Sequence, residues 1–448
     1  MRYLLYLSFR GLFSVQRRFR RRFTRGGRLL FFGIIAAAVV GIDTNRTMGY
    51  QVFTLMTAIL LTGAAGTPFF RARFSARRDL PRFGTVGEPL TYRIEIQNRS
   101  RRPQRGLLLF DEGADPRPDF QTFANTPEPG ERERNRFDRW IKFYRWQWLV
   151  GEAGGDRPRD VPLPHLAPGE TGVVEVRIIP GRRGSLRLTG ITVARPDPLG
   201  VVNAHVRIAL PQSVMVLPRR YDLPPIRLPG NRRYQSGGVA LTTSVGESEE
   251  FVSLRDYRPG DPIRHIHWKS WARTRKPVVK EHQEEFFVRH ALVLDTFYRD
   301  GRTPVFEAAV SVAASFASTV RTQDSLLDLI FVGPEAYCFT SGRGLGGDER
   351  TLEVLASVSP RRDQPFEILP PLVLRRADAL SGCICVLLSW DEPRRDFVGR
   401  LRALALPTLV LVVVPDGAGP LDPGPMADRP DRLRPLRVSR IAEDLARL

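Results

Sequence analysis

Several residue types that can do chemistry are concentrated between Arg255 and Glu285, in the segment RDYRPGDPIRHIHWKSWARTRKPVVKEHQEE. This segment holds eight lysines or arginines, three histidines and two tryptophans around a Pro-Gly-Asp turn. His265 and His267 are two residues apart and would share one face of a strand, where they could bind zinc with a third ligand such as His282. No cysteine and no second His-x-His accompanies them, so a structural role is favoured over a metal site.

The basic residues of the same segment offer a second chemistry, the binding of phosphate by charge-assisted hydrogen bonds. The candidates are Arg255, Arg258, Arg264 and Lys269. An ion-pair network is the favoured interpretation, with the tryptophans packed on arginine stems, and its acidic partners would be Glu247, Asp256, Asp261 and Glu281. A zinc- or phosphate-handling hydrolase centred on His265, His267 and Asp261 is the alternative, although no serine lies on a nucleophile elbow.

Two apolar stretches near the N-terminus predict how this segment is anchored. Residues 1–28 hold nine arginines and no acid, and residues 29–70 read as a transmembrane hairpin with spans at about 29–42 and 50–68. A secretory signal peptide is the competing interpretation, but the only Ala-x-Ala match lies inside the first apolar run. Arginines flank the pair on both outer sides and only Arg46 lies between the spans, so both ends should be cytoplasmic.

The charge of the whole chain fits this topology. The formal net charge is +20 and the isoelectric point is near 10.8, which indicates an anionic partner. Arginines beside the membrane facing anionic lipid account for much of it, so we expect the lipid bilayer as a partner and no nucleic acid. The three cysteines, Cys338, Cys383 and Cys385, are too few for a disulfide framework, and a reducing compartment is expected.

The middle of the chain has the alternation of β-strands. In LTYRIEIQN, Tyr92, Ile94 and Ile96 would share a buried face, and similar runs separated by turns predict a β-sandwich over residues 83–219. A shift of phase at Gly190 predicts a bulge. Residues 114–166 form an insertion with three of the six tryptophans, which would either anchor at the membrane interface or pack on the sandwich. A polar linker, residues 220–250, follows.

Residues 288–448 alternate between apolar strands and helical segments, which predicts a doubly wound α/β domain. Ligands of such sheets bind beyond the carboxyl ends of the strands, so Asp295 and residues 389–391 would lie at the functional edge. Von Willebrand factor type A domains hold Mg²⁺ there with an Asp-x-Ser-x-Ser motif. Here Phe297 and Arg299 stand where the serines would be, so the metal site is expected to be degenerate.

The segment 251–287 resembles the signature of the bacterial family known as domain of unknown function 58. The matching residues are Arg255, Tyr257, Pro259, Gly260, Asp261, Arg264, Ile266, Trp268, Lys269, Ala272, Arg273, Val279 and Glu281. PGRRGSLRLTGITVARPDPLG, Pro180–Gly200, is similar to the family's P-x-R-x-G…DPxGL phrases, and the paired apolar spans also fit. On these features the resemblance extends over almost the whole chain, apart from the insertion and the altered type A edge.

The resemblance implies a membrane-anchored cytoplasmic accessory protein with a von Willebrand factor type A-like domain, of a family commonly encoded beside MoxR-type AAA ATPases. We therefore expect an adaptor or assembly protein of the bacterial inner membrane with no catalytic activity and no cofactor. Self-association, or association with related family members, is left open. The residues expected to dock a partner, or to join the α/β domain to the sandwich, are Arg255, Tyr257, Asp261, Arg264, Trp268, Lys269 and Arg273.

Overall fold

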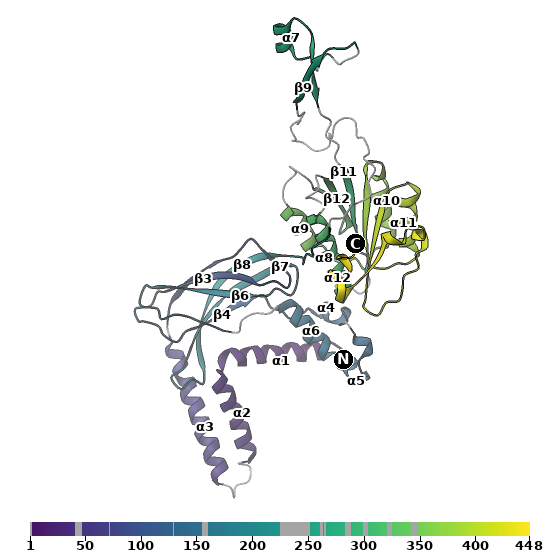
Figure 1. The fold of residues 1–448 in the computed structure, drawn as a ribbon. Helices are drawn as coiled ribbons and strands as arrows, with labels where there is room; N and C mark the ends of the chain where they lie inside the picture. The colour runs from purple at the N-terminus through teal and green to yellow at the C-terminus, as the bar shows by residue number, and fades with distance from the viewer. Residues whose placement is uncertain are drawn as a thin grey trace.

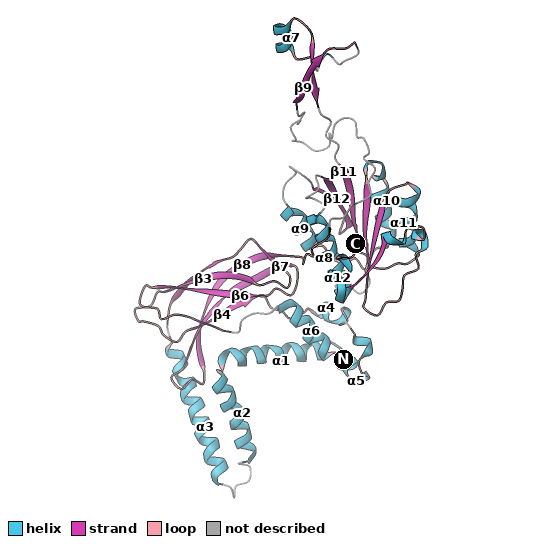
Figure 2. Cartoon of the chain, in the orientation of Figure 1, coloured by secondary structure: helices cyan, strands magenta, loops and turns pink. Residues whose placement is uncertain are grey.

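The computed structural model describes residues 2–40, 47–70, 72–128, 130–154, 160–224, 251–259, 263, 266–282, 288–298, 303–319, 325–341 and 348–448. Figure 1 shows a β-sandwich with a pair of helices projecting from one end and an α/β domain at the other. Figure 2 shows how the helices and strands are segregated among these parts. The chain therefore contains an all-β domain and a mixed α/β domain, as its hydrophobic patterns predict.

Three helices precede the sandwich: α1 (Arg2–Arg22), α2 (Arg25–Val40) and α3 (Thr47–Gly66). α2 and α3 lie side by side, and α1 lies across the end of the pair that meets the sandwich (Figure 1). Among the described residues one helix, Met48–Gly66, is long and apolar enough to cross a membrane, which by itself is weak evidence for membrane association. The other expected span falls in α2, whose 16 residues are fewer than the roughly 20 that a bilayer core requires.

The sandwich is built from two sheets. The first sheet has the order β1-β3-β6, with bounds Phe74–Asp79, Leu90–Asn98 and Thr171–Ile178. The second has the order β2-β8-β7-β4-β5, with bounds Phe83–Thr85, Asn203–Leu217, Gly184–Pro196, Leu108–Gly113 and Val161–Pro162. Tyr92, Ile94 and Ile96 are buried between the sheets, as their alternation predicts. The β7–β8 register shifts between Leu188 and Gly190, so the predicted bulge is confirmed.

The predicted start of the sandwich at residue 83 is wrong, because β1 (Phe74–Asp79) already pairs with β3. The sequence of β1, FSARRD, does not show the usual alternation of a strand, because a charged residue occupies a position that faces the core. Arg78 is buried and donates hydrogen bonds to the carboxylate of Asp111 and the carbonyl of Gly190. The buried guanidinium is thus paired, which is the condition for placing a charge inside a protein.

The insertion at 114–166 folds as short helices, α4 (Phe120–Asn125), α5 (Arg136–Ile141) and α6 (Phe143–Gly154), before β5 rejoins the sheet. Its aromatic side chains pack mainly on α1, in a small core formed by Tyr6, Phe123, Trp146 and Leu149. Packing on the sandwich, one of the two alternatives for these aromatics, is therefore replaced by packing on the N-terminal helix, and anchorage at the membrane interface stays a prediction. With 12 residues, α6 is marginal as an isolated helix, so its packing on α1 contributes to its stability.

The α/β domain has one six-stranded sheet of order β13-β12-β11-β14-β15-β16, parallel except for β13. Its strands are Ala336–Ser341, Ser325–Val332, Val288–Leu294, Gly382–Leu387, Thr408–Val414 and Leu433–Arg437. Helices α8 (Pro304–Thr319), α9 (Asp348–Ser357) and α12 (Ile441–Leu445) cover one face. Helices α10 (Leu369–Leu374) and α11 (Glu392–Ala403) cover the other. The strand order reverses between β11 and β14, where open sheets of this kind bind ligands.

Candidate functional site

The chemically rich segment folds as a small unit of two strands and one helix. β9 (Phe251–Asp256) pairs antiparallel with β10 (Val278–His282), and α7 (Trp268–Thr274) lies between them in the chain. Ile266, Val278 and Val279 are buried in this unit, and Ile266 forms a bridge to Val279. Figure 1 shows the unit standing apart from the sandwich and from the α/β sheet.

The predicted docking residues are distributed unevenly over this unit. Asp261 and Arg264 lie outside the described residues. Trp268, Lys269 and Arg273 are exposed, while Arg255 and Tyr257 are partly buried. The ring of Trp268 stacks on that of Trp271 with 5.2 Å between centroids, and Trp268 remains 59% exposed. The helix thus presents two stacked indoles flanked by cationic side chains.

The described part of the chain contains no assembled set of ligands for the zinc site that the sequence suggested. His265 lies outside this part, and among the residues that the structure describes no three His, Cys, Asp or Glu side chains are grouped so that they could hold a metal ion. The Nδ1 atom of His267 is 2.7 Å from the hydroxyl oxygen of Ser270, one turn into α7. This contact ties His267 to the helix start. The hydrolase centred on His265, His267 and Asp261 stays a sequence prediction.

The edge of the α/β sheet places Asp295 directly after β11, where the type A motif would begin. Its carboxylate is fully buried and accepts hydrogen bonds from Arg394 Nε at 2.6 Å, from Leu388 N at 3.1 Å and from Phe297 N at 2.9 Å. Burial raises the pKa of Asp295, and the Arg394 guanidinium opposes this. The residues present do not fit a divalent cation, because the guanidinium of Arg394 already occupies the anionic side of Asp295.

The predicted residues 389–391 lie at the same edge and complete this network. Asp391 caps the N-terminus of α11, accepting from Arg394 N, and its Oδ2 lies 2.6 Å from Arg394 Nη1. Burial alone would raise the pKa of Asp391, but the hydrogen bonds from Arg394 and Ser389 hold it below its ordinary value. Asp295 and Asp391 thus lie together at the predicted edge, whereas the role of Arg394 was not predicted. Its position on an otherwise charged helix carries no signal of burial.

The junction between the sandwich and the α/β domain depends on residues that were not among the predicted docking residues. Arg183, in the turn before β7, is buried and donates to Leu355 O at 3.1 Å and to Val358 O at 2.5 Å. It also pairs with Glu307 of α8. A hydrogen bond from Tyr221 N to Ser315 Oγ at 2.8 Å adds to the junction. Within the part of the chain that the structure describes, these contacts between the two domains lie away from the β9–α7–β10 unit.

A second missed junction holds the helices on the sandwich. Thr24, between α1 and α2, donates from N to Val201 O at 3.1 Å, and Asp197 Oδ1 accepts from Val201 N and Val202 N at 2.6 Å each. A Cβ atom added at Gly27 would lie 1.9 Å from Val201 O, so only glycine allows this approach. These contacts give the RPDPLG phrase a structural role as the seat of the helix pair.

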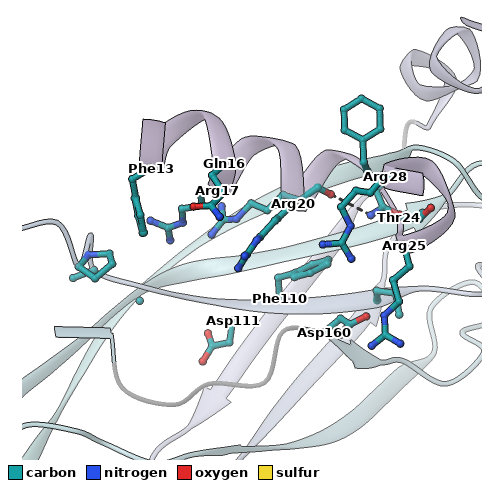
Figure 3. A pocket seen from close by; sticks show the side chains of 17 residues that line it. Phe13, Gln16, Arg17, Arg20, Thr24, Arg25, Arg28, Phe110, Asp111 and Asp160 are labelled. Atoms are coloured by element: carbon teal, nitrogen blue, oxygen red, sulfur yellow. Dashed lines mark hydrogen bonds between the residues drawn. The ribbon is translucent and has the colours of Figure 1, made fainter. Parts of the chain in front are cut away.

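Beside this seat lies a cavity of about 430 Å³ between the helices and the second sheet of the sandwich. Five arginines of α1 and α2 line it: Arg17, Arg20, Arg21, Arg25 and Arg28. Figure 3 shows Arg20 and Arg28 directed from the helices toward the strand that carries Phe110. Their sequence positions predict only a membrane flank, since nothing in the spacing of these arginines reveals a shared cavity.

Comparison with known proteins supports part of the expected kinship. Residues 253–416 match the family model described as "Protein of unknown function DUF58". A curated relative, "Uncharacterized protein YeaD" of Bacillus subtilis (strain 168), is 27% identical over 166 residues, or 36% of this chain and 39% of the relative. The chain thus spans well under two thirds of the relative's length. The match covers the β9–α7–β10 unit and most of the α/β domain, whereas the expected resemblance also included the sandwich and the helix pair.

Among solved structures, partial likenesses include the CARDB domain of the PF1109 protein from Pyrococcus furiosus, with 12% identity and a TM-score of 0.18. That likeness covers 33% of this chain and 89% of that domain. The ASH / PapD-like domain of human CEP192 has 12% identity and a TM-score of 0.17, covering 32% of this chain and 84% of that domain. With TM-scores so low, neither likeness carries an argument about this protein.

Proposed function

We propose that the protein is a membrane-anchored adaptor or assembly protein that partners a MoxR-type AAA ATPase and has no catalytic activity of its own. In this proposal α2 and α3 cross the bacterial inner membrane as a hairpin, and both folded domains lie in the cytoplasm. The arginines outside the pair, with Arg46 alone between the helices, support this orientation. The α/β domain would be a von Willebrand factor type A-like platform whose cation is replaced by Arg394.

The observation that carries the adaptor role is the stacked tryptophan pair on α7. A 59% exposed Trp268, backed by Trp271 and flanked by Lys269 and Arg273, has the composition of an interface hot spot. Leaving an indole in water forfeits the free energy that burial would supply, about 25 cal/mol per Å² of apolar area. A partner that covers the pair would recover it. The unit stands clear of the other domains in Figure 1, which leaves room for that partner.

The test is an affinity pull-down from detergent-solubilised membranes of the native organism, read by mass spectrometry. The baits are wild type, Trp268→Ala and the matched control Trp140→Ala, which removes a 51% exposed indole from α5 in the insertion. Circular dichroism first checks that all three baits are folded. We expect an AAA ATPase with wild type and with the control, and its loss with Trp268→Ala.

Recovery of the ATPase with all three baits would move the contact away from α7 while keeping the adaptor role. If wild type recovers no AAA ATPase, the proposed partnership is wrong. Metal analysis of the purified protein gives a separate readout, because stoichiometric zinc would favour the hydrolase alternative.

A further inference from the structure

We propose that the cavity between α1, the start of α2 and the sandwich binds the phosphate-bearing headgroup of an anionic glycerophospholipid. This inference rests on the membrane anchorage in the proposed function but not on the ATPase partnership. It would make the helix–sandwich seat a lipid-dependent joint, because the ligand would contact α1, α2 and β4 together.

The charges lining the cavity are unbalanced. Arg21 is paired with the buried carboxylate of Glu112 at 2.7 Å, and Asp111 is engaged by Arg78. The remaining arginines, for which no ion pair is formed with any described residue, are Arg17, Arg20, Arg25 and Arg28. Asp160 is the remaining acid among the described lining residues. Four guanidinium groups face one carboxylate, and a phosphodiester would supply the missing negative charge.

Arg17 reports this imbalance most directly. Burial lowers the pKa of Arg17, and the neighbouring charge of Arg21 lowers it further. The carboxylates of Glu112 and Asp115 oppose the effect without cancelling it. A phosphate oxygen in the cavity would act in the same sense as those carboxylates and stabilise the charged guanidinium.

Beside the charged residues and the polar Gln16, Thr24 and Asn203, the lining includes large apolar side chains, which favour a lipid over a free anion. The large apolar lining residues are Phe13 of α1, Phe23 between α1 and α2, and Leu108 and Phe110 of β4. A volume of about 430 Å³ lies within the range of roughly 300–1,000 Å³ that is usual for small-molecule sites. Aromatic and aliphatic walls suit a glycerol group and the first methylenes of an acyl chain, whereas inorganic phosphate gains nothing from them.

The position of α1 supplies the route to the membrane. Tyr6, Phe9 and Phe13 of this helix pack toward α4 and α6. The opposite face exposes Leu4, Leu12 and Val15, which are 67%, 62% and 64% exposed. α1 lies across the end of the α2–α3 pair (Figure 1), so this apolar face is placed to enter the headgroup boundary as interfacial helices do. The cavity then opens beside the leaflet that α2 enters.

The test measures binding of dissolved short-chain lipid to the full-length protein in detergent, by native mass spectrometry and by titration calorimetry. The probes are dioctanoyl-phosphatidylglycerol, dioctanoyl-phosphatidylcholine and inorganic phosphate. The variant Arg17→Gln/Arg20→Gln removes two cavity charges. The matched control Arg18→Gln/Arg22→Gln removes the same charge from exposed positions on α1 that do not line the cavity.

We expect one equivalent of phosphatidylglycerol to bind wild type and the control alike, and about a tenfold weaker affinity for the cavity variant. Equal loss in both variants would show general attraction to a basic helix and overturn the proposal. So would unchanged binding in the cavity variant or equal affinity for phosphatidylcholine. If inorganic phosphate binds as tightly as phosphatidylglycerol, the ligand of the cavity is a free phosphate and not a lipid headgroup, and the proposal is wrong. Carbonate extraction of membranes tests anchorage separately, so failure of one proposal does not imply failure of the other.

Discussion

Replacing Arg183 by alanine should weaken the junction between the sandwich and the α/β domain by about 3 kcal/mol. The substitution removes the donor for two backbone carbonyls, Leu355 O and Val358 O, and the partner of Glu307. Breaking a buried ion pair from one side costs about 3–5 kcal/mol, and each orphaned buried acceptor about 1–3 kcal/mol. The Glu307 side chain is 36% exposed and regains water, which places the estimate at the lower end.

The assay is thermal and chemical unfolding of the detergent-solubilised full chain, followed by circular dichroism. At roughly 2–4 °C per kcal/mol for a domain of this size, the transition should fall by about 6–12 °C. Arg182→Ala is the matched control, since Arg182 is exposed, adjacent and carries the same charge. It should change stability by no more than about 0.5 kcal/mol. The loss of stability in Arg183→Lys should lie between those of the two alanine variants, because lysine keeps the charge but lacks the planar fork of hydrogen-bond donors.

Equal destabilisation by Arg182→Ala and Arg183→Ala would refute the reasoning, because only net charge would then matter. An unchanged transition in Arg183→Ala would also refute it, since the buried carbonyls would have to be satisfied by water. In that case the junction would be a wet contact between two independent domains.

Two further predictions concern the α/β domain. Burial lowers the pKa of His290 to about 4, so unfolded chains take up a proton first as the pH falls. The free energy of unfolding should therefore drop by roughly 3 kcal/mol between pH 6.5 and 4. Denaturant midpoints measured across this pH range should fall for wild type but not for His290→Gln. The same pH dependence in both proteins would contradict the prediction. Arg394→Met should lower the free energy of unfolding by about 3–5 kcal/mol, because it leaves the buried carboxylate of Asp295 without its ion-pair partner. The control Arg395→Met breaks only an exposed ion pair and should lower it by at most about 1 kcal/mol. Urea titration that finds the two variants alike would exclude the buried network.

The α/β domain was the most predictable part of the chain. Its central strands are continuous apolar runs, such as TLVLVVV in β15, and the long helix α8 has an unmistakable apolar composition. The edge strands β13 and β16 were missed, because AYCFTS and LRPLR are short and partly polar. An edge strand needs only one neighbour and one buried face, so its sequence is weakly constrained.

In the sandwich, hydrophobic alternation predicted β3 and β6, whose burial follows a period of two. β1 escaped because Arg78 occupies a core position. An arginine can replace an apolar residue there only when a partner on another strand neutralises it, and Asp111 lies 33 positions away. No local pattern contains that information.

Local patterns in the sequence were enough to establish the order of the parts, the signature segment and the excess of positive charge beside the apolar helices. Periodicity and local composition are sufficient for those conclusions, because they depend on neighbours within one helix or strand. Which charged side chains are buried, and which of them come together, depends on how distant segments pack. Arg394 on Asp295, Arg183 on Glu307 and the arginines around one cavity are pairings between distant segments, and their energetics depend on burial that only the packed chain creates.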